Sequence, residues 1–234
     1  MIANLFRSLG IAPMTTPNVS NPTVVPKPVM RHTVTHPRAG SDLISLIGFN
    51  DQAFPISLPA EPWAEKLGER VLALPSRIGG GSTNIASALR LALEMTRRCP
   101  KGCRRRIFLL SDGEANVNTH DTEPAAQAIA DAFINLNVIA FGEAANSTLL
   151  KKLAAKTHHG KFIPVDGLHA MASALQHGGG PVQAKRQHRQ ETALICIDLS
   201  PSMGSRDMQN GQTRIEAVRD ALKSLITYKS QVWG

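Results

Sequence analysis

The sequence predicts an α/β fold in which a doubly wound, mostly parallel sheet carries helices on both faces. From residue 42 onward, short apolar runs alternate with longer segments whose apolar residues recur at helical spacing. Several runs, such as "LISLIGF" (43–49), are apolar throughout, as strands covered on both faces are. Strands that alternate with helices in this way are typical of a parallel sheet. Aromatic residues make up only 4% of the chain, so Ile, Leu, Val and Ala must form most of the core.

The individual elements follow from periodicity and turn residues. The expected strands are 43–49, 53–59, 106–113, 137–142, 160–165 and 192–200. The expected helices are 62–74, 82–98, 122–136, 147–157, 167–177 and 213–229. Pro55 places the second strand at an edge of the sheet, because proline donates no backbone hydrogen bond. Ser82 or Thr83 can cap the second helix, and we expect Pro124 in the first turn of the third.

Two segments depart from the alternating pattern. Residues 1–40 hold six of the fifteen prolines, a density that prevents regular helix, so we interpret them as an extended arm or linker. The segment "GGGPVQAKRQHRQE" (178–191) is glycine-rich and polar, which is the composition of a linker. The remaining sequence of residues 41–234 is long enough to bury the core of a single domain.

The sequence predicts a cytoplasmic location. No apolar run reaches the roughly 20 residues that span a bilayer, and the first residues lack the basic region of a signal peptide. The three cysteines are an odd number, which argues against a disulfide framework. Cys196 stands inside an apolar run, where we expect a buried thiol.

The formal charge of +8 is concentrated in clusters. Residues 97–106 ("RRCPKGCRRR") carry six basic side chains, and residues 185–189 ("KRQHR") carry three. Such clusters can bind nucleic acid, an anionic membrane surface or an acidic protein, or they can be solvated loops. Nucleic-acid binding through the phosphates is therefore an alternative function, although the clusters lack the interleaved aromatic residues that stack on bases.

A group of oxygen-bearing side chains follows the last expected strand. Asp198, Ser200 and Ser202 occupy alternate positions, so in an extended loop their side chains can converge on one point. Hard oxygen ligands suit Mg²⁺ or Mn²⁺, but one carboxylate would hold such a cation weakly. Further oxygens are available from Thr83 in "GGGSTN" and from Asp112 in "LLSDGE". Asp198 and Asp112 both fall at the carboxyl ends of expected strands, the edge where ligands bind in parallel sheets.

These motifs resemble those of von Willebrand factor type A domains, which have a Rossmann-like sheet. The matching segments are "ICIDLSPSMG" with "TRIEAVRDALKSLI", "GFNDQA", "GGGSTNIASALRLAL", "RRIFLLSDGEAN" and "INLNVIAFGEAANSTLLKKLAAKTHHGKFIPV". The resemblance covers residues 42–234 apart from the linker. Asp-x-Ser-x-Ser alone is a weak signal, whereas three motifs at separate places are specific.

The resemblance implies a metal-ion-dependent adhesion site (MIDAS). In its terms Ser200, Ser202 and Thr83 are the hydroxyl ligands, and Asp198 and Asp112 are the carboxylates, often acting through water. A Glu or Asp of a partner protein commonly completes the coordination of the metal in this family. We therefore expect a protein-interaction module that uses Mg²⁺ or Mn²⁺, serves within a multiprotein assembly, and is not an enzyme.

The order of the motifs departs from the family pattern. Family members begin with the Asp-x-Ser-x-Ser strand, whereas this chain places it last. The chain therefore reads as a circular permutation in which residues 178–191 join the old ends, since fourteen residues reach at most about 46 Å. Alternatively, residues from 192 onward could insert into a neighbouring molecule and form a domain-swapped dimer. The permutation requires residues 192–229 to lie in the middle of the sheet, beside 43–49 and 106–111.

Other chemistries fit the sequence less well. "GGGSTN" lacks the Gly-Lys-Ser/Thr ending of a phosphate-binding loop, which disfavours nucleotide hydrolysis. Ser202 lies in "SPSMG", which lacks the first glycine of the hydrolase motif Gly-x-Ser-x-Gly. Cys99 and Cys103 have no second cysteine pair nearby to complete a zinc site, and a turn between helix and strand explains them better.

Overall fold

The computed structural model describes residues 42–58, 65–74, 78–79, 81–113, 115–141, 147–177 and 190–233. The expected arm (1–40) and residues 178–189 of the expected linker lie outside these ranges, so both remain predictions. Within the described ranges, no helix combines the length and the hydrophobicity that crossing a lipid bilayer requires.

Strands and helices alternate along the described chain, which confirms the α/β class. The strands are β1 (Leu43–Phe49), β2 (Ala53–Pro55), β3 (Arg104–Ser111), β4 (Asn135–Phe141), β5 (Phe162–Val165) and β6 (Glu191–Asp198). The helices are α2 (Glu65–Leu72), α3 (Ile85–Thr96), α4 (Thr119–Asp131), α5 (Ser147–Ala155), α6 (Leu168–His177) and α7 (Arg214–Trp233), with a 3₁₀ turn η2 (Pro201–Gly204).

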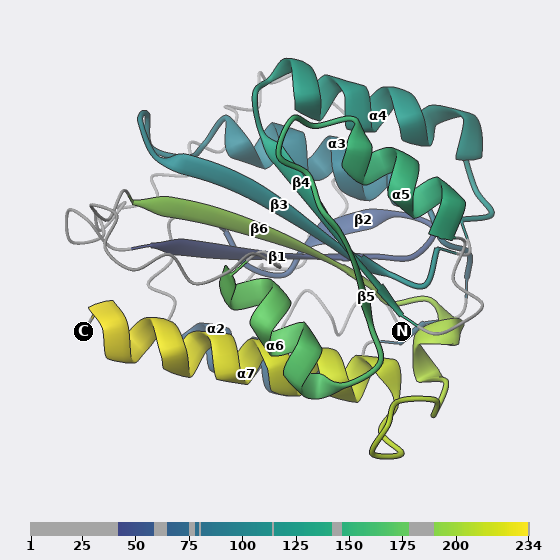
Figure 1. The fold of residues 1–234 in the computed structure, drawn as a ribbon, viewed down its shortest axis with the longest axis vertical. Coiled ribbons are helices and arrows are strands. Elements are labelled where there is room, and N and C mark those ends of the chain that lie inside the picture. The colour runs from purple at the N-terminus through teal and green to yellow at the C-terminus, as the bar shows by residue number, and fades with distance from the viewer. Residues whose placement is uncertain are drawn as a thin grey trace, which may run out of the picture. The chain divides into compact units, whose positions relative to one another are not determined.

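The strands form one sheet in the order β2-β1-β6-β3-β4-β5 (Figure 1). β2 runs antiparallel to β1, and every other neighbouring pair is parallel. β6 comes last in the chain but lies between β1 and β3, with seven register pairs on each side. The strand of residues 192–229 therefore occupies the middle of the sheet, beside 43–49 and 106–111, as predicted.

Helices cover both faces of the sheet, with α3, α4 and α5 on one face and α2, α6 and α7 on the other (Figure 1). Alternate residues of β6 point to opposite faces. Ile195 and Ile197 join the core beneath α7, whereas Leu194 and Cys196 join the core beneath α3. Because both faces of the central strands are buried, their sequences are apolar throughout.

The start of α3 differs from the expectation. The cap is Asn84, whose side chain accepts a hydrogen bond from the backbone N–H of Ser87 at 3.0 Å. Ser82 and Thr83 precede the helix and belong to the loop that leads into it. Asparagine caps a helix as well as serine or threonine does, so local sequence did not distinguish the three positions.

Helix α4 also begins and ends earlier than predicted. It starts at Thr119, which puts Pro124 in the helix interior beyond the first turn. The chain leaves the helix where Phe133 adopts a left-handed conformation with φ of 55°. Residues 135 and 136, expected to be helical, instead pair with β3 in the parallel sheet. Pairing with a neighbouring strand has here outweighed local helical periodicity.

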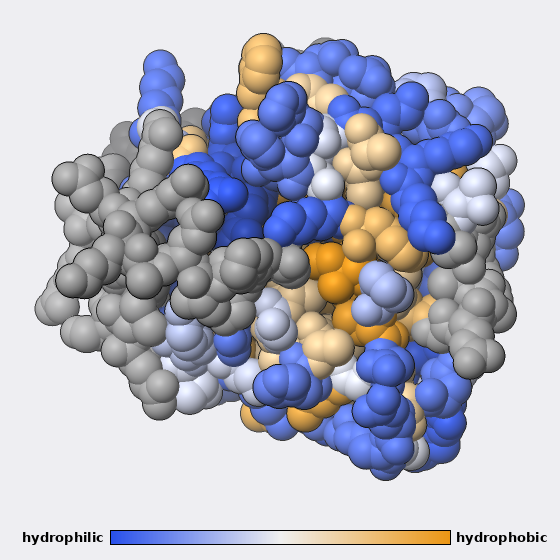
Figure 2. All heavy atoms as spheres, in the orientation of Figure 1, coloured by the Kyte–Doolittle hydropathy of each residue, from blue (hydrophilic) through white to orange (hydrophobic). Residues whose placement is uncertain are grey.

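The outermost strand on each side of the sheet is short and contains a proline. β2 is shorter than expected and includes Pro55, and β5 includes the exposed Pro164. A proline lacks the N–H that another strand would use, so each edge resists further pairing. Figure 2 shows hydrophobic surface over β5 and α6, bordered by hydrophilic side chains.

Buried ion pairs tie the amino ends of the central strands together. Lys229 of α7 pairs with Asp42, which also accepts a hydrogen bond from the backbone N–H of Glu191 at 2.9 Å. The Glu191 carboxylate in turn pairs with Arg106 of β3 at 2.5 Å. The last helix is thereby anchored at the beginning of β1. Asp198 lies at the other end of the strands, where β6 finishes.

We predict that Gly160→Ala destabilises the protein. A Cβ atom there would lie 2.1 Å from the carbonyl oxygen of Ala154 and 2.6 Å from that of Leu136, and backbone atoms cannot move aside cheaply. The free energy of unfolding in urea should fall by about 3 kcal/mol. Gly68→Ala in α2 is the control, because a Cβ there meets nothing within 4 Å. It should gain about 0.5–1 kcal/mol from helix propensity, and equal losses in the two variants would contradict the packing.

Candidate metal centre

Two aspartates lie at the carboxyl ends of adjacent strands. Asp198 is the last residue of β6, and Asp112 directly follows β3. Because β3 and β6 are parallel neighbours, both carboxylates reach the same edge of the sheet. The side chains are buried, with 0% exposure at Asp198 and 1% at Asp112. The predicted convergence of residues 86 positions apart is confirmed.

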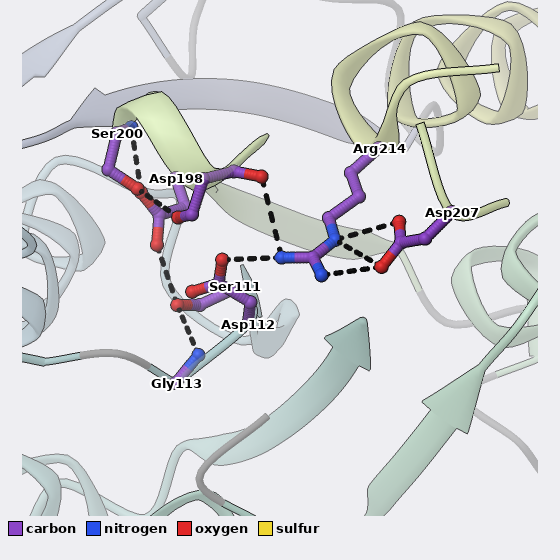
Figure 3. Close-up of polar contacts among 8 residues, drawn as sticks. Ser111, Asp112, Gly113, Asp198, Ser200, Asp207 and Arg214 are labelled. Atoms are coloured by element: carbon purple, nitrogen blue, oxygen red, sulfur yellow. Dashed lines mark hydrogen bonds and ion pairs between the residues drawn. The ribbon is translucent and has the colours of Figure 1, made fainter. Parts of the chain in front are cut away.

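The turn after β6 brings two hydroxyl groups beside Asp198. The backbone N–H of Ser200 donates to Asp198 Oδ1 at 2.9 Å, which folds the chain back toward the carboxylate (Figure 3). η2 follows at once, and it places Ser202 Oγ 3.0 Å from Ser200 Oγ. Asp198, Ser200 and Ser202 therefore lie together as predicted, although in a 3₁₀ turn and not in a fully extended loop.

Ser111 completes this group and was not predicted from the sequence. Its hydroxyl donates to Asp198 Oδ2 at 2.7 Å and accepts a hydrogen bond from the backbone N–H of Gly113 at 3.1 Å. Ser111 thereby links the ends of β3 and β6. Its signal in the sequence was a serine that ends an apolar strand directly before Asp112.

Thr83 reaches the same edge through its loop. Its backbone N–H donates to Asn116 Oδ1 at 2.8 Å, and its carbonyl accepts from the N–H of Asn116 at 3.3 Å. Gly79 of the same loop donates to the carbonyl of Leu199, directly after β6, at 3.3 Å. These contacts hold the Thr83 loop between the segments that follow β6 and β3, with Thr83 2% exposed.

Arg214 and Asp207 form a second unpredicted part of the site. Arg214 donates through Nη1 to Asp112 Oδ2 at 2.7 Å and through Nη2 to Asp207 Oδ2 at 2.5 Å (Figure 3). Its place is set by a capping box, in which Thr213 N–H donates to Glu216 Oε2 and Glu216 N–H donates to Thr213 Oγ1. "TRIE" could have revealed both the box and the unusual arginine at the positive end of a helix.

The two carboxylates differ in how their charge is compensated. Asp112 is paired with Arg214, whereas no cationic side chain of the described residues pairs with Asp198. Burial raises the pKa of Asp198 to about 6, and hydrogen bonds from Ser111 and Ser200 offset part of that rise. The fold thus holds a buried carboxylate whose ionised form lacks a counter-ion, which costs free energy.

The oxygen atoms around Asp198 fit a small divalent cation. Adjacent oxygen ligands of an octahedral Mg²⁺ lie about 2.9 Å apart, because each Mg–O distance is about 2.0–2.1 Å. Ser200 Oγ and Ser202 Oγ are hydrogen-bonded to each other at 3.0 Å, a separation that two ligands of one such cation would also have. Nowhere in the described ranges do three or more His, Cys, Asp or Glu side chains cluster as metal ligands. A site built here consequently depends on hydroxyl oxygens and two carboxylates.

The other sequence candidates have different surroundings. Within 97–106, Arg97 and Lys101 are exposed, but Arg106 is buried against Glu191 and is not available to phosphates. The cluster 185–189 lies outside the described residues. Burial raises the pKa of Cys99 to about 11, which disfavours the thiolate that zinc requires.

We predict that Ser111→Ala weakens the fold in the presence of a chelator. The variant removes the hydroxyl that donates to Asp198, and a buried carboxylate then loses one of its partners. The free energy of unfolding in urea with EDTA should fall by about 2 kcal/mol. Ser224→Ala is the control, because Ser224 only returns a hydrogen bond within α7 to the carbonyl of Asp220. It should change stability by less than about 0.5 kcal/mol, and a similar effect in both variants would contradict the role of Ser111.

The solved structures that are similar to this chain include the conserved hypothetical protein BatB from Bacteroides thetaiotaomicron and an uncharacterized membrane spanning protein from Vibrio fischeri. The first is 20% identical with a TM-score of 0.45, covering 54% of this chain and 72% of that one. The second is 22% identical with a TM-score of 0.28, covering 58% and 74%. Comparison with the curated proteins finds no significant match.

The sequence model of the von Willebrand factor type A domain matches residues 37–176. That range runs from β1 to α6 and includes Thr83 and Asp112, whereas Asp198, Ser200 and Ser202 follow it. The match covers more than half of the chain, and the chain therefore belongs to the von Willebrand factor type A domain family.

Proposed function

We propose that this chain is a protein-interaction module that binds an acidic side chain of a partner protein through Mg²⁺ or Mn²⁺. The proposed ligands are Asp198, Ser200, Ser202 and Thr83, together with Asp112, which acts directly or through water. The observation that carries the proposal is the buried Asp198 carboxylate, which pairs with no cationic side chain among the described residues and is surrounded by serine hydroxyl groups. A bound divalent cation would compensate that charge and offer an open coordination position to a carboxylate.

Each residue has a distinct part in this proposal. Asp198 supplies the uncompensated negative charge, and Ser111 holds its second oxygen. Ser200 and Ser202 supply neutral oxygens, so they bind a cation without cancelling its charge. Asp112 contributes less charge, because Arg214 already neutralises it in part. A site of low total charge leaves the cation attractive to a further anion, and this favours binding of a partner's Glu or Asp over turnover of a substrate.

The kind of partner and the location are part of the same proposal. We expect a role within a multiprotein assembly in the cytoplasm and no enzymatic activity. Nucleic-acid binding is not proposed, because Arg106, one of the six basic side chains of 97–106, is committed to Glu191.

We also propose that the domain is circularly permuted and closes within one chain. β6 and α7 supply the first strand and helix of the family pattern, and β6 lies beside β1 and β3. The contact of Lys229 with Asp42 brings the end of α7 to the start of β1. In the unpermuted order the first helix leads directly into the second strand, which here are α7 and β1. Their contact therefore supports a permutation in which this connection is lost and a new one joins α6 to β6.

Metal binding is tested by calorimetry on the chain freed of metal with EDTA. We expect binding of one Mg²⁺ or Mn²⁺, an affinity at least about tenfold lower in Asp198→Asn and Thr83→Ala, and tighter Mn²⁺ binding when acetate is added as a model carboxylate. Asp131→Asn is the control. Asp131 is an exposed carboxylate at the last residue of α4 and is not one of the proposed ligands. Absence of cation binding in the wild type would refute the proposal.

The permutation is tested with a chain that begins at residue 190, continues to 234, and then runs from 42 to 177 through a short linker. It should fold and bind Mn²⁺ with an affinity within about twofold of the natural order, because the joined ends already meet. A chain that lacks 190–234 is the control and should not fold, since it loses the central strand. An unfolded reordered chain would contradict the permutation, and a natural-order dimer in light scattering would favour strand exchange between molecules.

A further inference from the structure

Arg214 makes contacts on both sides of the site edge. It donates to Asp112 Oδ2 at 2.7 Å, and through Nε and Nη2 it holds both oxygens of Asp207. Nη1 also lies 3.4 Å from the carbonyl oxygen of Ser202. Arg214 as a residue is 7% exposed, so water screens these interactions little. Figure 3 shows the side chain spanning the gap between α7 and the end of β3.

Several contacts hold the positive charge of Arg214 at this position. Arg214 is the first residue of α7, where the helix dipole disfavours a positive charge. The Thr213–Glu216 capping box fixes the start of the helix, and Asp207, a residue of the loop before it, fixes the guanidinium. An arginine held so firmly at an unfavourable helix position indicates a function for its charge.

That charge affects the two site carboxylates unequally. Arg214 Nη1 is hydrogen-bonded to Asp112 Oδ2, while among the described residues Asp198 receives its hydrogen bonds from Ser111 and Ser200. A metal ion that took Asp112 as a direct ligand would have to compete with the guanidinium for that carboxylate. Asp198 and the two serines offer their oxygens without such competition.

We propose that Arg214 is a positioning residue that withholds Asp112 from direct contact with the metal, an inference that rests on the proposed metal function. With Asp112 held back, a coordination position stays with water and is open to the carboxylate of a partner. Arg214 thereby lowers the affinity for the metal and raises the affinity of the bound metal for an acidic ligand. Asp207 pairs with the other side of the guanidinium and offsets part of its charge.

If Arg214 had a purely structural role, its removal would change the metal affinity in the opposite direction. Removing a structural arginine would loosen the site and weaken metal binding. Removing an arginine that competes for Asp112 would strengthen metal binding and remove a water molecule from the metal. The direction of the change therefore separates the two roles.

The experiment measures Mn²⁺ binding by the full chain with calorimetry and counts the water molecules on bound Mn²⁺ by electron paramagnetic resonance in ¹⁷O-labelled water. In Arg214→Gln we expect Mn²⁺ affinity to rise about fivefold or more, because a positive charge near the metal is removed. We also expect one fewer coordinated water and a weaker response to acetate. Arg214→Lys should keep most of the wild-type behaviour, because the charge remains.

Matched variants exclude a general effect of charge. Arg206→Gln removes the same charge from the loop that precedes α7, but Arg206 is 68% exposed in its side chain and approaches Glu216 only at 4.0 Å. It should change Mn²⁺ affinity by less than about twofold. In an Asp112→Asn background, Arg214→Gln should no longer alter the number of coordinated waters.

Each outcome decides between the roles. Equal or weaker Mn²⁺ affinity in Arg214→Gln, with an unchanged water count, overturns the inference and leaves the metal site standing. No Mn²⁺ binding in the wild type refutes the proposed function itself. If Arg214→Gln does not fold, Asp207→Asn gives the answer. This variant should fold, because Asp207 is 41% exposed in its side chain. It should bind Mn²⁺ more weakly with the same water count, because the charge of Arg214 is then less offset and holds Asp112 more firmly. Unchanged or tighter binding, or an additional coordinated water from a loosened site, contradicts the inference.

Discussion

The pairing of β6 with both β1 and β3 is the interaction on which the rest of the structure depends. β6 is fully buried and contributes alternate side chains to the cores on both faces of the sheet. Without it, β1 and β3 would have no common neighbour, and the sheet would divide into two incomplete halves. The same pairing determines where Asp198 lies, because the strand ends at the edge where β3 delivers Asp112. Fold and site are therefore consequences of one set of backbone hydrogen bonds.

The two ends of β6 treat buried charge in opposite ways. At the amino end, Glu191 pairs with Arg106, and the neighbouring Asp42 pairs with Lys229. Removing one partner of such a buried pair is strongly destabilising, so these contacts resist separation of α7 from the sheet. At the carboxyl end, the described partners of Asp198 are hydroxyl and amide donors. An ionised carboxylate buried in that way raises the free energy of the chain, and a bound cation would lower it.

Arg214 joins the helix that follows β6 to the strand beside it. Through Asp112 it reaches the end of β3, and through Asp207 it reaches the loop that leads into α7. The three carboxylates Asp198, Asp112 and Asp207 exceed this single guanidinium by two negative charges, which is the charge of one divalent cation. The excess negative charge therefore lies at the carboxyl ends of β3 and β6, where the described ranges contain no cluster of His or Cys ligands.

The sequence by itself determined the α/β class, most strands, the buried Cys196 and the proximity of Asp198, Ser200 and Ser202, because apolar periodicity and Asp-x-Ser-x-Ser are local patterns. It predicted α4 poorly, since residues 135 and 136 follow helical periodicity but gain more from pairing with β3. Only the tertiary structure placed Ser111 on Asp198 and Arg214 on Asp112, contacts that span 87 and 102 positions. No local pattern encodes such contacts, because they depend on which strands become neighbours and on where a helix begins above them.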